Sequence, residues 1–322
     1  MSSPAPSTSR LSLVIAAYNE EANLNQLFER LLAVDWDGQG IEIEMLFVDD
    51  HSRDRTPEIL RQLAARDPRV KWLRFSRNFG SHKAFTAGLE AATGDAAVIL
   101  AADLQDPPEC VPAMIEKWRT GAKVVWAVRG ARAGESWLNK FFSRCYYLLM
   151  RRYAIADLPE TGADFLLMDR IVMDSLRAAP ERNTSLLALI QWMGFDQAQI
   201  IYTKEARRAG VSKWTFSKRI KLAVDSFVSF SYVPIRLVSL LGVFSAALGF
   251  LYALFLVVRR ILYEAPIEGW TSLICVVLIM SGLQLLMLGV LGEYLWRTFD
   301  ESRRRPRFLI EASHGIDRQA IT

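Results

Sequence analysis

Carboxylate side chains stand directly after two of the β-rich runs in this sequence. Asp49 and Asp50 close one run, and Asp103 closes another, with Gln105 two residues later. Ligands of open α/β sheets bind beyond the carboxyl ends of the strands, so we expect these side chains to meet in one crevice. Carboxylate oxygens, completed by water and substrate phosphates, are the ligands that Mg²⁺ or Mn²⁺ prefers. The alternative is that each carboxylate only caps a helix or begins a turn.

Several other chemistries are excluded by what the sequence lacks. Neither a G-x-G-x-x-G nor a G-x-x-x-x-G-K-[ST] pattern follows any predicted strand, which excludes dinucleotide and P-loop sites. The three histidines are scattered, so we expect no His-rich metal site and no Ser-His-Asp arrangement. The three cysteines are odd in number and far apart, which predicts neither a disulfide framework nor a thiolate zinc site and indicates a reducing compartment.

The elements that position the carboxylates alternate along the chain. Short β-rich runs are separated by longer amphipathic stretches, a rhythm that predicts an α/β domain with a largely parallel sheet. Thr56 followed by Pro57 predicts an N-cap with proline at the first helical position, and another helix is expected to begin near Pro108. The expected strands are Leu11–Ala17, Ile43–Asp49, Val70–Phe75, Ala96–Ala101 and Lys123–Val128.

Two charge-free segments near the C-terminus predict transmembrane helices. Leu237–Val258 and Thr271–Gly292 are each long enough to cross a hydrocarbon core of roughly 30 Å. Aromatic residues gather at their ends, as they do at membrane interfaces, whereas a buried helix pair of a soluble protein is the alternative. Before them, Ser217–Val233 alternates basic and apolar residues and predicts an interfacial amphipathic helix, with an ordinary surface helix as the alternative.

The charge pattern predicts the orientation of these segments. The net charge is only +4, but most of the surplus lies between Lys204 and Arg307, which indicates an anionic surface or ligand there; a lipid headgroup fits this charge as well as nucleic acid does. The partners we expect include membrane lipid and no nucleic acid. Basic residues flank both spans, which places the flanks in the cytoplasm, although Arg259 and Arg260 in the expected loop argue the other way. The first ten residues lack an apolar segment and predict a disordered leader, so the first domain is expected to stay cytoplasmic.

Four segments of the chain carry a recognisable combination of residues: Ala16–Glu21, Val48–Thr56, Arg77–Gly80 and Ala102–Pro108. Together they resemble the family 2 glycosyltransferases of GT-A fold. The similarity runs from Leu11 to about Glu301 and is greatest to the polyprenyl-phosphate glycosyltransferases, which include dolichol-phosphate mannose synthases and bactoprenol glucosyltransferases. It implies a Rossmann-like, mostly parallel α/β sheet domain with a C-terminal amphipathic helix and two transmembrane helices.

The resemblance also implies a division of the chain and a location. We expect a leader at 1–10, a GT-A catalytic domain at 11–216, the interfacial helix at 217–233, the transmembrane pair at 234–298 and a cytoplasmic basic tail at 299–322. The implied location is the inner (plasma) membrane, which the chain would cross more than once with its catalytic domain in the cytoplasm. A homo-oligomer such as a tetramer, packed through the transmembrane pairs, is a further expectation.

Roles for individual residues follow from the resemblance. Asp103 and Gln105 would hold Mg²⁺ or Mn²⁺ on the donor pyrophosphate, and Asp164 would line the reaction centre as a positioning group or a base. The implied donor-binding residues are Tyr18, Glu20, Asp49, Asp50 and Arg77. The implied acceptor-phosphate residues, for which a solvated face or lipid-headgroup contact is the alternative, are Arg129, Arg132, Ser143, Arg144, Arg208 and Lys213. Family members often have Asp-x-Asp where this chain has Ala101-Ala102-Asp103, but Mg²⁺ needs only one or two protein carboxylates when phosphates complete its shell.

The implied reaction is transfer of a sugar from a nucleotide-sugar to a polyprenyl phosphate such as undecaprenyl phosphate, in cell-envelope glycosylation. A single displacement with inversion is the simplest mechanism, because an anionic phosphate needs little general-base help. UDP-glucose is the expected donor, from the similarity of Glu181–Arg182 and Leu189–Gly194 to the glucosyltransferase branch. The alternatives are a processive polysaccharide synthase, which needs more spans, and a non-catalytic membrane-tethered nucleotide-sugar binder.

Overall fold

The computed structural model describes residues 9–130, 165–179, 185–203, 233–263, 269–317 and 321. The chain forms two compact units. We call them the sheet domain, which comprises residues up to Ala223 together with Pro306–Thr322, and the helical unit, Val224–Arg305. The chain therefore leaves the sheet domain, forms the helical unit and then returns to the sheet domain.

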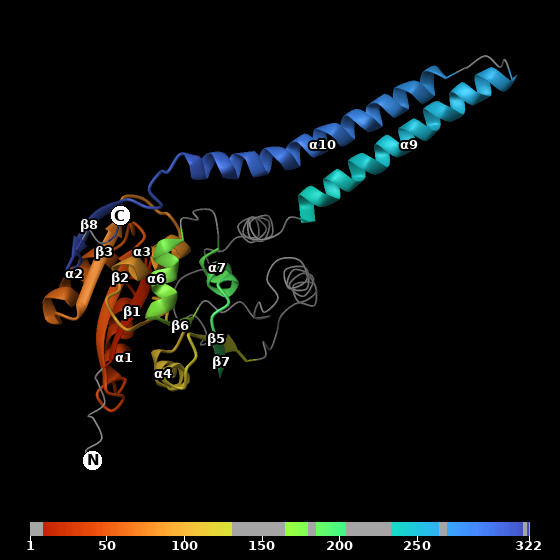
Figure 1. Cartoon of the computed structure of the whole chain (residues 1–322). Helices are drawn as coiled ribbons and strands as arrows, with labels where there is room; N and C mark the ends of the chain where they lie inside the picture. Colours follow the sequence, from red (N-terminus) through yellow and green to blue (C-terminus); the bar gives the residue numbers. More distant parts are fainter. Residues whose placement is uncertain are drawn as a thin grey trace. The chain divides into compact units, whose positions relative to one another are not determined.

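The described residues of the sheet domain form one sheet of eight strands in the order β7-β5-β6-β4-β1-β2-β3-β8 (Figure 1). The pairs β1/β2, β2/β3, β1/β4 and β5/β7 are parallel, whereas β6 and β8 run antiparallel to their neighbours. The mostly parallel α/β sheet expected from the sequence is thus confirmed. The strands are β1 Ser9–Ala17, β2 Ile41–Asp49, β3 Val70–Phe75, β4 Ala96–Ala101, β5 Val124–Arg129, β6 Leu166–Asp169, β7 Gln197–Tyr202 and β8 Ile310–His314.

Helices cover both faces of this sheet. Leu13 and Ile15 of β1 belong to a core shared with α1, α2 and α4, while α3 packs against β1 and β2. Gly88 lets α3 approach closely, since a Cβ atom there would lie 2.3 Å from Cγ1 of Val14. Burial on both faces explains why β1 is apolar almost without interruption. The helices are α1 Leu24–Ala33, α2 Thr56–Arg66, α3 Ser81–Ala91, the 3₁₀ turn Pro108–Cys110, α4 Val111–Arg119, α6 Arg170–Ala178 and α7 Leu186–Trp192.

The start of α2 differs by one residue from the sequence prediction. The helix begins at Thr56 with Pro57 second, and Oδ1 of Asp54 accepts the N–H of Thr56 at 3.0 Å. The hydroxyl oxygen of Thr56 instead accepts the N–H of Glu20 at 2.9 Å. The side chain expected to cap its own helix therefore anchors the loop after β1.

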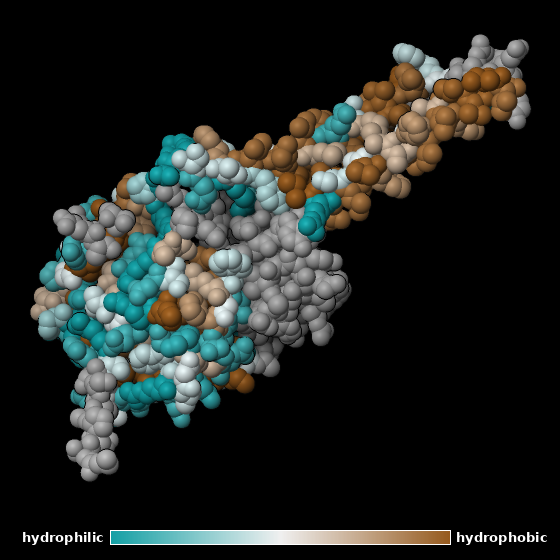
Figure 2. All heavy atoms as spheres, in the orientation of Figure 1, coloured by the Kyte–Doolittle hydropathy of each residue, from teal (hydrophilic) through white to brown (hydrophobic). Residues whose placement is uncertain are grey.

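The helical unit contains α9 Val233–Tyr263 and α10 Trp270–Ser302, which pack against each other. Within them, Ile235–Arg259 and Leu273–Ser302 are long and apolar enough to cross a membrane. Figure 2 shows hydrophobic residues covering both helices, in contrast to the largely hydrophilic face of the sheet domain. Apolar surface exposed over this extent is typical of a membrane or protein contact. Arg259 and Arg260 lie in the last turns of α9 rather than in the predicted loop.

The C-terminal segment differs from the predicted basic tail. Helix α10 continues ten residues beyond Gly292, and β8 then pairs antiparallel with β3, with His314 opposite Trp72 and Ser313 opposite Leu73. Residues 310–314 are therefore an edge strand of the sheet domain. The predicted interfacial helix lies, apart from Val233, outside the described residues.

Candidate functional site

The loops that follow β1, β2 and β4 lie side by side at one edge of the sheet. Ala17 of β1 is opposite Asp49 of β2, and Ala16 is opposite Ala101 of β4. The chain leaves β1 toward β2 but leaves β4 toward the other half of the sheet, which makes this edge a topological switch point, where α/β sheets bind ligands. The carboxylates predicted to meet in one crevice follow strands that end at this edge, and the shared crevice itself stays a prediction.

Backbone strain is concentrated in the same three loops. Asn19, His51 and Leu104 follow β1, β2 and β4 with φ angles of 53°, 62° and 61°, in the left-handed region that non-glycine residues rarely adopt. Among the described residues only one other non-glycine residue, Arg304, has a positive φ. Such conformations persist where neighbouring contacts enforce them, and they cluster at functional sites.

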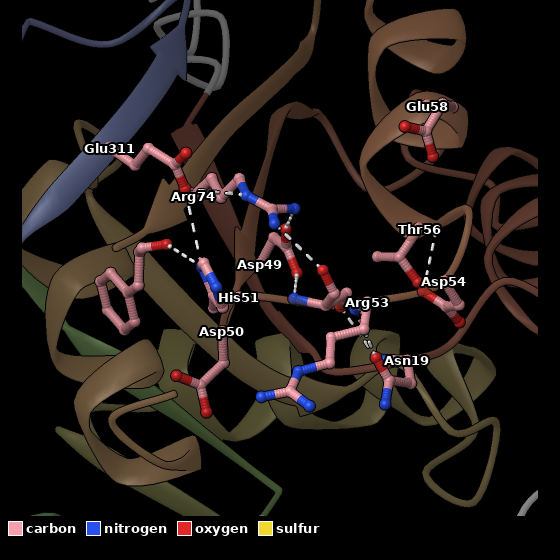
Figure 3. Close-up of polar contacts among 12 residues, drawn as sticks. Asn19, Asp49, Asp50, His51, Arg53, Asp54, Thr56, Glu58, Arg74 and Glu311 are labelled. Atoms are coloured by element: carbon pink, nitrogen blue, oxygen red, sulfur yellow. Dashed lines mark hydrogen bonds and ion pairs between the residues drawn. The ribbon is translucent and has the colours of Figure 1, made fainter. Parts of the chain in front are cut away.

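Hydrogen bonds enforce this conformation by joining the loop after β1 to the loop after β2 (Figure 3). The N–H of Asn19 donates to Oγ of Ser52 at 2.9 Å, and Oδ1 of Asn19 accepts the N–H of Arg53 at 2.8 Å. Glu21 repeats this reciprocal pattern, because its N–H donates to Asp54 while its carboxylate accepts the N–H of Arg55. These hydrogen bonds join the two loops into one continuous rim.

Asp49, a predicted donor-binding residue, is fully buried beneath this rim. Its Oδ1 accepts the N–H of Ser52 at 2.8 Å, and its Oδ2 accepts from Nη1 of Arg74 at 2.7 Å. The same guanidinium donates from Nη2 to the carbonyl oxygen of Ser52 at 3.0 Å. In the structure Asp49 thus shapes the loop; its predicted contact with the nucleoside stays a prediction.

Asp50 joins the rim to the segment 77–80. Its carboxylate, 3% exposed, accepts the N–H of Phe79 at 2.6 Å and the N–H of Gly80 at 2.9 Å. Burial raises the pKa of Asp50 to about 6, an effect that the two N–H donors reduce and the neighbouring charge of Asp49 reinforces. The guanidinium of Arg77, another predicted donor-binding residue, stacks 4.1 Å above the ring of Phe79. Asp50 therefore connects two motifs that are separated in the chain, Val48–Thr56 and Arg77–Gly80.

Asp103 and Gln105 occupy the turn after β4. Asp103 is 8% exposed, and its Oδ1 accepts the N–H of Gln105 at 3.2 Å across Leu104. Within the described ranges, no group of three or more His, Cys, Asp or Glu side chains could hold a metal ion. One carboxylate and one amide oxygen still fit Mg²⁺ or Mn²⁺, since such ions commonly keep water and substrate phosphates in their shell.

Two buried residues that the sequence analysis did not single out as site residues lie beside this turn. Tyr202, at the end of β7, donates its hydroxyl proton to Oδ1 of Asp106 at 2.6 Å. Burial and the nearby charge of Asp106 raise the pKa of Tyr202, while a side-chain hydrogen bond from Arg129 opposes that rise. Arg129, a predicted acceptor residue, pairs in register with Tyr202 across β5 and β7. The one signal in the sequence that could have pointed to Tyr202 was the β-rich run that ends at this residue.

The remaining predicted residues fall into two groups. Tyr18 and Glu20 are half-buried in the loop directly after β1, where Oε2 of Glu20 accepts from the side chain of Asn23 at 2.6 Å. Six predicted residues lie outside the described residues, and their roles stay predictions: Arg132, Ser143, Arg144, Asp164, Arg208 and Lys213.

A separate pocket of the sheet domain shares no residue with the three loops. It is lined by side chains of α3, α6 and α7 together with Arg307. Burial raises the pKa of Glu90 in this pocket, although the charges of Arg307 and Arg177 counteract that rise. Nη1 of Arg307 lies 3.4 Å from Oε1 of Glu90, so the pocket contains an internal ion pair.

Comparisons with known proteins identify the family of this chain. The family model for glycosyl transferase family 2 matches residues 12–176. The chain is 41% identical over 310 residues to the uncharacterized glycosyltransferase YkcC of Bacillus subtilis, covering 96% of each chain. It is 35% identical to the SfII prophage-derived bactoprenol glucosyl transferase of Shigella flexneri, covering 95% of this chain and 98% of the relative. A solved structure, the mannosyltransferase PcManGT of Pyrobaculum calidifontis in complex with GDP-Man and Mn²⁺, is 16% identical, with a TM-score of 0.44 over 89% of this chain and 87% of its own.

Proposed function

Because this chain belongs to glycosyl transferase family 2, we propose that it transfers a sugar from a nucleotide-sugar to a polyprenyl phosphate in a membrane. The observation that carries the proposal is that the strands before Asp50 and Asp103 end on either side of β1 at the switch point of the sheet, in a chain that also forms two helices long enough to span a membrane. The relative named bactoprenol glucosyl transferase supports the acceptor class, since its similarity spans nearly the whole of both chains.

The donor is expected to bind across the rim formed by the loops after β1 and β2. Asp50 and Glu20 place carboxylates there, which suit the N–H groups of a base and the hydroxyls of a ribose. Tyr18, Asp49 and Arg77 complete the proposed donor set. We propose UDP-glucose as the donor.

Asp103 and Gln105 would hold Mg²⁺ or Mn²⁺ at the end of β4. When bound, a divalent ion neutralises the charge that develops on a departing nucleoside diphosphate. The turn at Leu104 fixes the carboxylate of Asp103 through the N–H of Gln105, so this chain presents its single metal-motif carboxylate in a defined orientation.

In the proposed reaction, an oxygen of the lipid phosphate attacks the anomeric carbon as the bond to the nucleoside diphosphate breaks, so the configuration inverts. The acceptor loses no proton to a strong base, because a phosphate monoester is already anionic near neutral pH. Arg129, Arg132, Ser143, Arg144, Arg208 and Lys213 are the proposed phosphate ligands. Guanidinium groups suit this task because they form paired, charge-assisted hydrogen bonds with phosphate. Asp164 is proposed to line the reaction centre.

The proposed topology places the sheet domain in the cytoplasm, with α9 and α10 crossing the plasma membrane and residues 264–268 outside. The basic residues on both flanks support it, because positive residues are retained on the cytoplasmic side. A single cysteine introduced by Glu268→Cys into a chain free of other cysteines should react with an impermeant reagent only from the outside. Labelling of this cysteine only after the cells are permeabilised would show the opposite topology, with residues 264–268 in the cytoplasm. A homo-oligomer through these helices stays a prediction.

The transfer itself can be tested on membranes that contain the full chain. They are incubated with labelled UDP-glucose, or in parallel GDP-mannose, together with undecaprenyl phosphate and Mg²⁺. The expected product is a monosaccharide linked to the lipid phosphate, with inverted anomeric configuration by NMR. A polymer would favour a processive synthase, and nucleotide binding without product would favour a non-catalytic binder.

A further inference from the structure

The segment Pro306–His314, which we call the C-terminal strap, returns from the helical unit to the sheet domain and reaches the rim. We propose that Glu311 of this strap is a positioning residue for the donor-binding loops, acting through Arg74 and His51. The role rests on the proposed function in one respect, namely that these loops bind the nucleotide of the donor.

The strap is fixed to the sheet domain along its whole length. The ring of Phe308 stacks on that of Phe75 with 5.1 Å between centroids, and the N–H of Ser76 donates to the carbonyl oxygen of Leu309 at 2.9 Å. Arg307 pairs with Glu90 and donates to the carbonyl oxygen of Ala179. Strand β8 then continues along β3. This attachment holds the backbone of Glu311 beside β3, at the register shift between Ala312, which is opposite Arg74, and Ile310, which is opposite Phe75.

Glu311 directs its carboxylate at the two residues that support the loop after β2 (Figure 3). Oε2 of Glu311 accepts from Nε of Arg74 at 3.1 Å and lies 3.6 Å from Nδ1 of His51. The same His51 nitrogen lies 3.0 Å from the carbonyl oxygen of Phe75. One carboxylate of the strap therefore contacts both a cation beneath the rim and a strained residue within it.

Arg74 transmits this contact to the carboxylates. Its guanidinium is held at three places, with Nη1 on Asp49, Nη2 on the carbonyl oxygen of Ser52 and Nε on Glu311. A planar guanidinium bound at three edges has a single orientation, which is why arginine suits fixed recognition geometry. Without Glu311 the guanidinium keeps two of these contacts and can rotate away from them. The loop that carries Asp50 would then lose one of its supports.

Because the side chain of Glu311 is exposed, its effect on nucleotide binding can be distinguished from its small contribution to folding stability. Its side chain is 51% exposed, and ion pairs this accessible contribute only about 0–1 kcal/mol to folding. Arg30–Glu109 is a control pair with the same exposures, 17% and 51%, and its two hydrogen bonds of 2.8 and 2.6 Å are shorter than the 3.1 Å contact of Arg74 with Glu311. Loss of Glu109 should therefore lower the melting temperature at least as much as loss of Glu311, whereas only Glu311 touches the rim.

The test uses the full chain in detergent and measures binding of UDP, and separately GDP, by calorimetry in the presence of Mn²⁺. Glu311→Ala is expected to weaken binding about two- to fivefold, a change of the size that one exposed charge contact can produce. Glu311→Gln retains an oxygen that can accept from Nε of Arg74, so it should recover much of that loss. Glu109→Ala should bind nucleotide as the wild type does.

Each outcome discriminates between the two proposals. If the wild type binds neither nucleotide, the donor function fails and the role of Glu311 falls with it. If the wild type binds but Glu311→Ala binds equally well, the positioning role is overturned while the donor function stands. In turnover assays the KM for the nucleotide-sugar should rise and the KM for the polyprenyl phosphate should stay unchanged. A rise in the acceptor KM alone would also contradict the assignment.

Discussion

The hydroxyl group of Tyr202 donates a hydrogen bond of 2.6 Å to Oδ1 of Asp106, although the two residues lie 96 positions apart in the chain. Tyr202 ends β7 near one edge of the sheet, and Asp106 lies three residues after Asp103 in the loop that follows β4. Both side chains are buried. The bond therefore ties the predicted metal-binding turn to the outer strands, on the side where Arg129 also ends its strand.

Tyr202→Phe removes this donor and leaves a buried carboxylate with one hydrogen bond fewer. A bond to a charged group contributes about 1.5–3 kcal/mol, so the melting temperature of the sheet domain should fall by several degrees. Differential scanning fluorimetry can measure this fall in melting temperature. Tyr252→Phe is the matched control, because Tyr252 is 45% exposed on α9. Equal melting temperatures for the two variants would show that the bond to Asp106 contributes nothing.

Asp103→Asn should abolish sugar transfer while leaving the fold intact. The amide keeps an oxygen that can accept the N–H of Gln105, but it loses the negative charge that a divalent cation requires. We expect a loss of at least about a hundredfold in kcat/KM, with an unchanged melting temperature. The measurement is product formation across a titration of Mg²⁺ and Mn²⁺. Full activity of this variant in the presence of a chelator would show that Asp103 does not bind a metal ion needed for transfer.

Asp50→Asn should reveal a pH-dependent contribution to stability. Burial raises the pKa of Asp50 from 3.8 to about 6, so the folded state binds this proton more tightly than the unfolded state does. The resulting stabilisation is complete below about pH 4 and is lost as the pH rises through 6, by at most roughly 3 kcal/mol.

The measurement is the difference in melting temperature between wild type and Asp50→Asn, followed from pH 4 to pH 7.5. The melting temperature of Asp50→Asn should rise relative to that of the wild type as the pH rises. At pH 7.5 the variant should also bind the donor less well if the carboxylate of Asp50 contacts the nucleotide. Stability and binding would then change in opposite directions, as expected for a buried charge retained for function. A constant difference across this range would contradict the raised pKa.

The sequence predicted the central strands because their signal is local. Val70–Phe75 and Ala96–Ala101 have the predicted bounds, and the other three predicted strands differ by two residues or fewer at their ends. Strand β8 was missed because Ile310–His314 mixes polar and apolar residues, and because its partner, β3, lies about 240 positions earlier in the chain. Long-range contacts of this kind leave no periodic pattern.

For the candidate site too, local signals could be read from the sequence and long-range contacts could not. Asp49, Asp50 and Asp103 could be placed together because parallel strands end at one edge of a sheet. The long-range contacts around them could not be placed, because Arg74, Tyr202 and Glu311 reach the site from other strands and carry no motif. Arg74 holds Asp49, Glu311 contacts Arg74, and Tyr202 holds Asp106. The individual role of Asp49 illustrates the limit, since only the structure shows that its two oxygens hold Ser52 and Arg74.

Arg144 is one of the residues that the resemblance assigns to the lipid phosphate of the acceptor. Arg129 is a less selective probe, because it hydrogen-bonds to Tyr202 and its replacement would also disturb the contact with Asp106. If Arg144 binds the acceptor, Arg144→Ala should raise the apparent KM for polyprenyl phosphate far more than the KM for the nucleotide-sugar. Losing one charge-assisted hydrogen bond costs about 1.5–3 kcal/mol, which is roughly a ten- to hundredfold fall in kcat/KM.

Arg144→Lys sharpens this test, because an ammonium group supplies a point charge where the guanidinium supplies two parallel hydrogen bonds. It should therefore restore only part of the acceptor affinity, whereas a purely electrostatic role would be restored almost fully. The steady-state KM values for both substrates are measured for wild type and both variants at one ionic strength, since salt screens such contacts. Weaker binding of the nucleotide-sugar with unchanged dependence on the acceptor would instead assign Arg144 to the pyrophosphate of the donor.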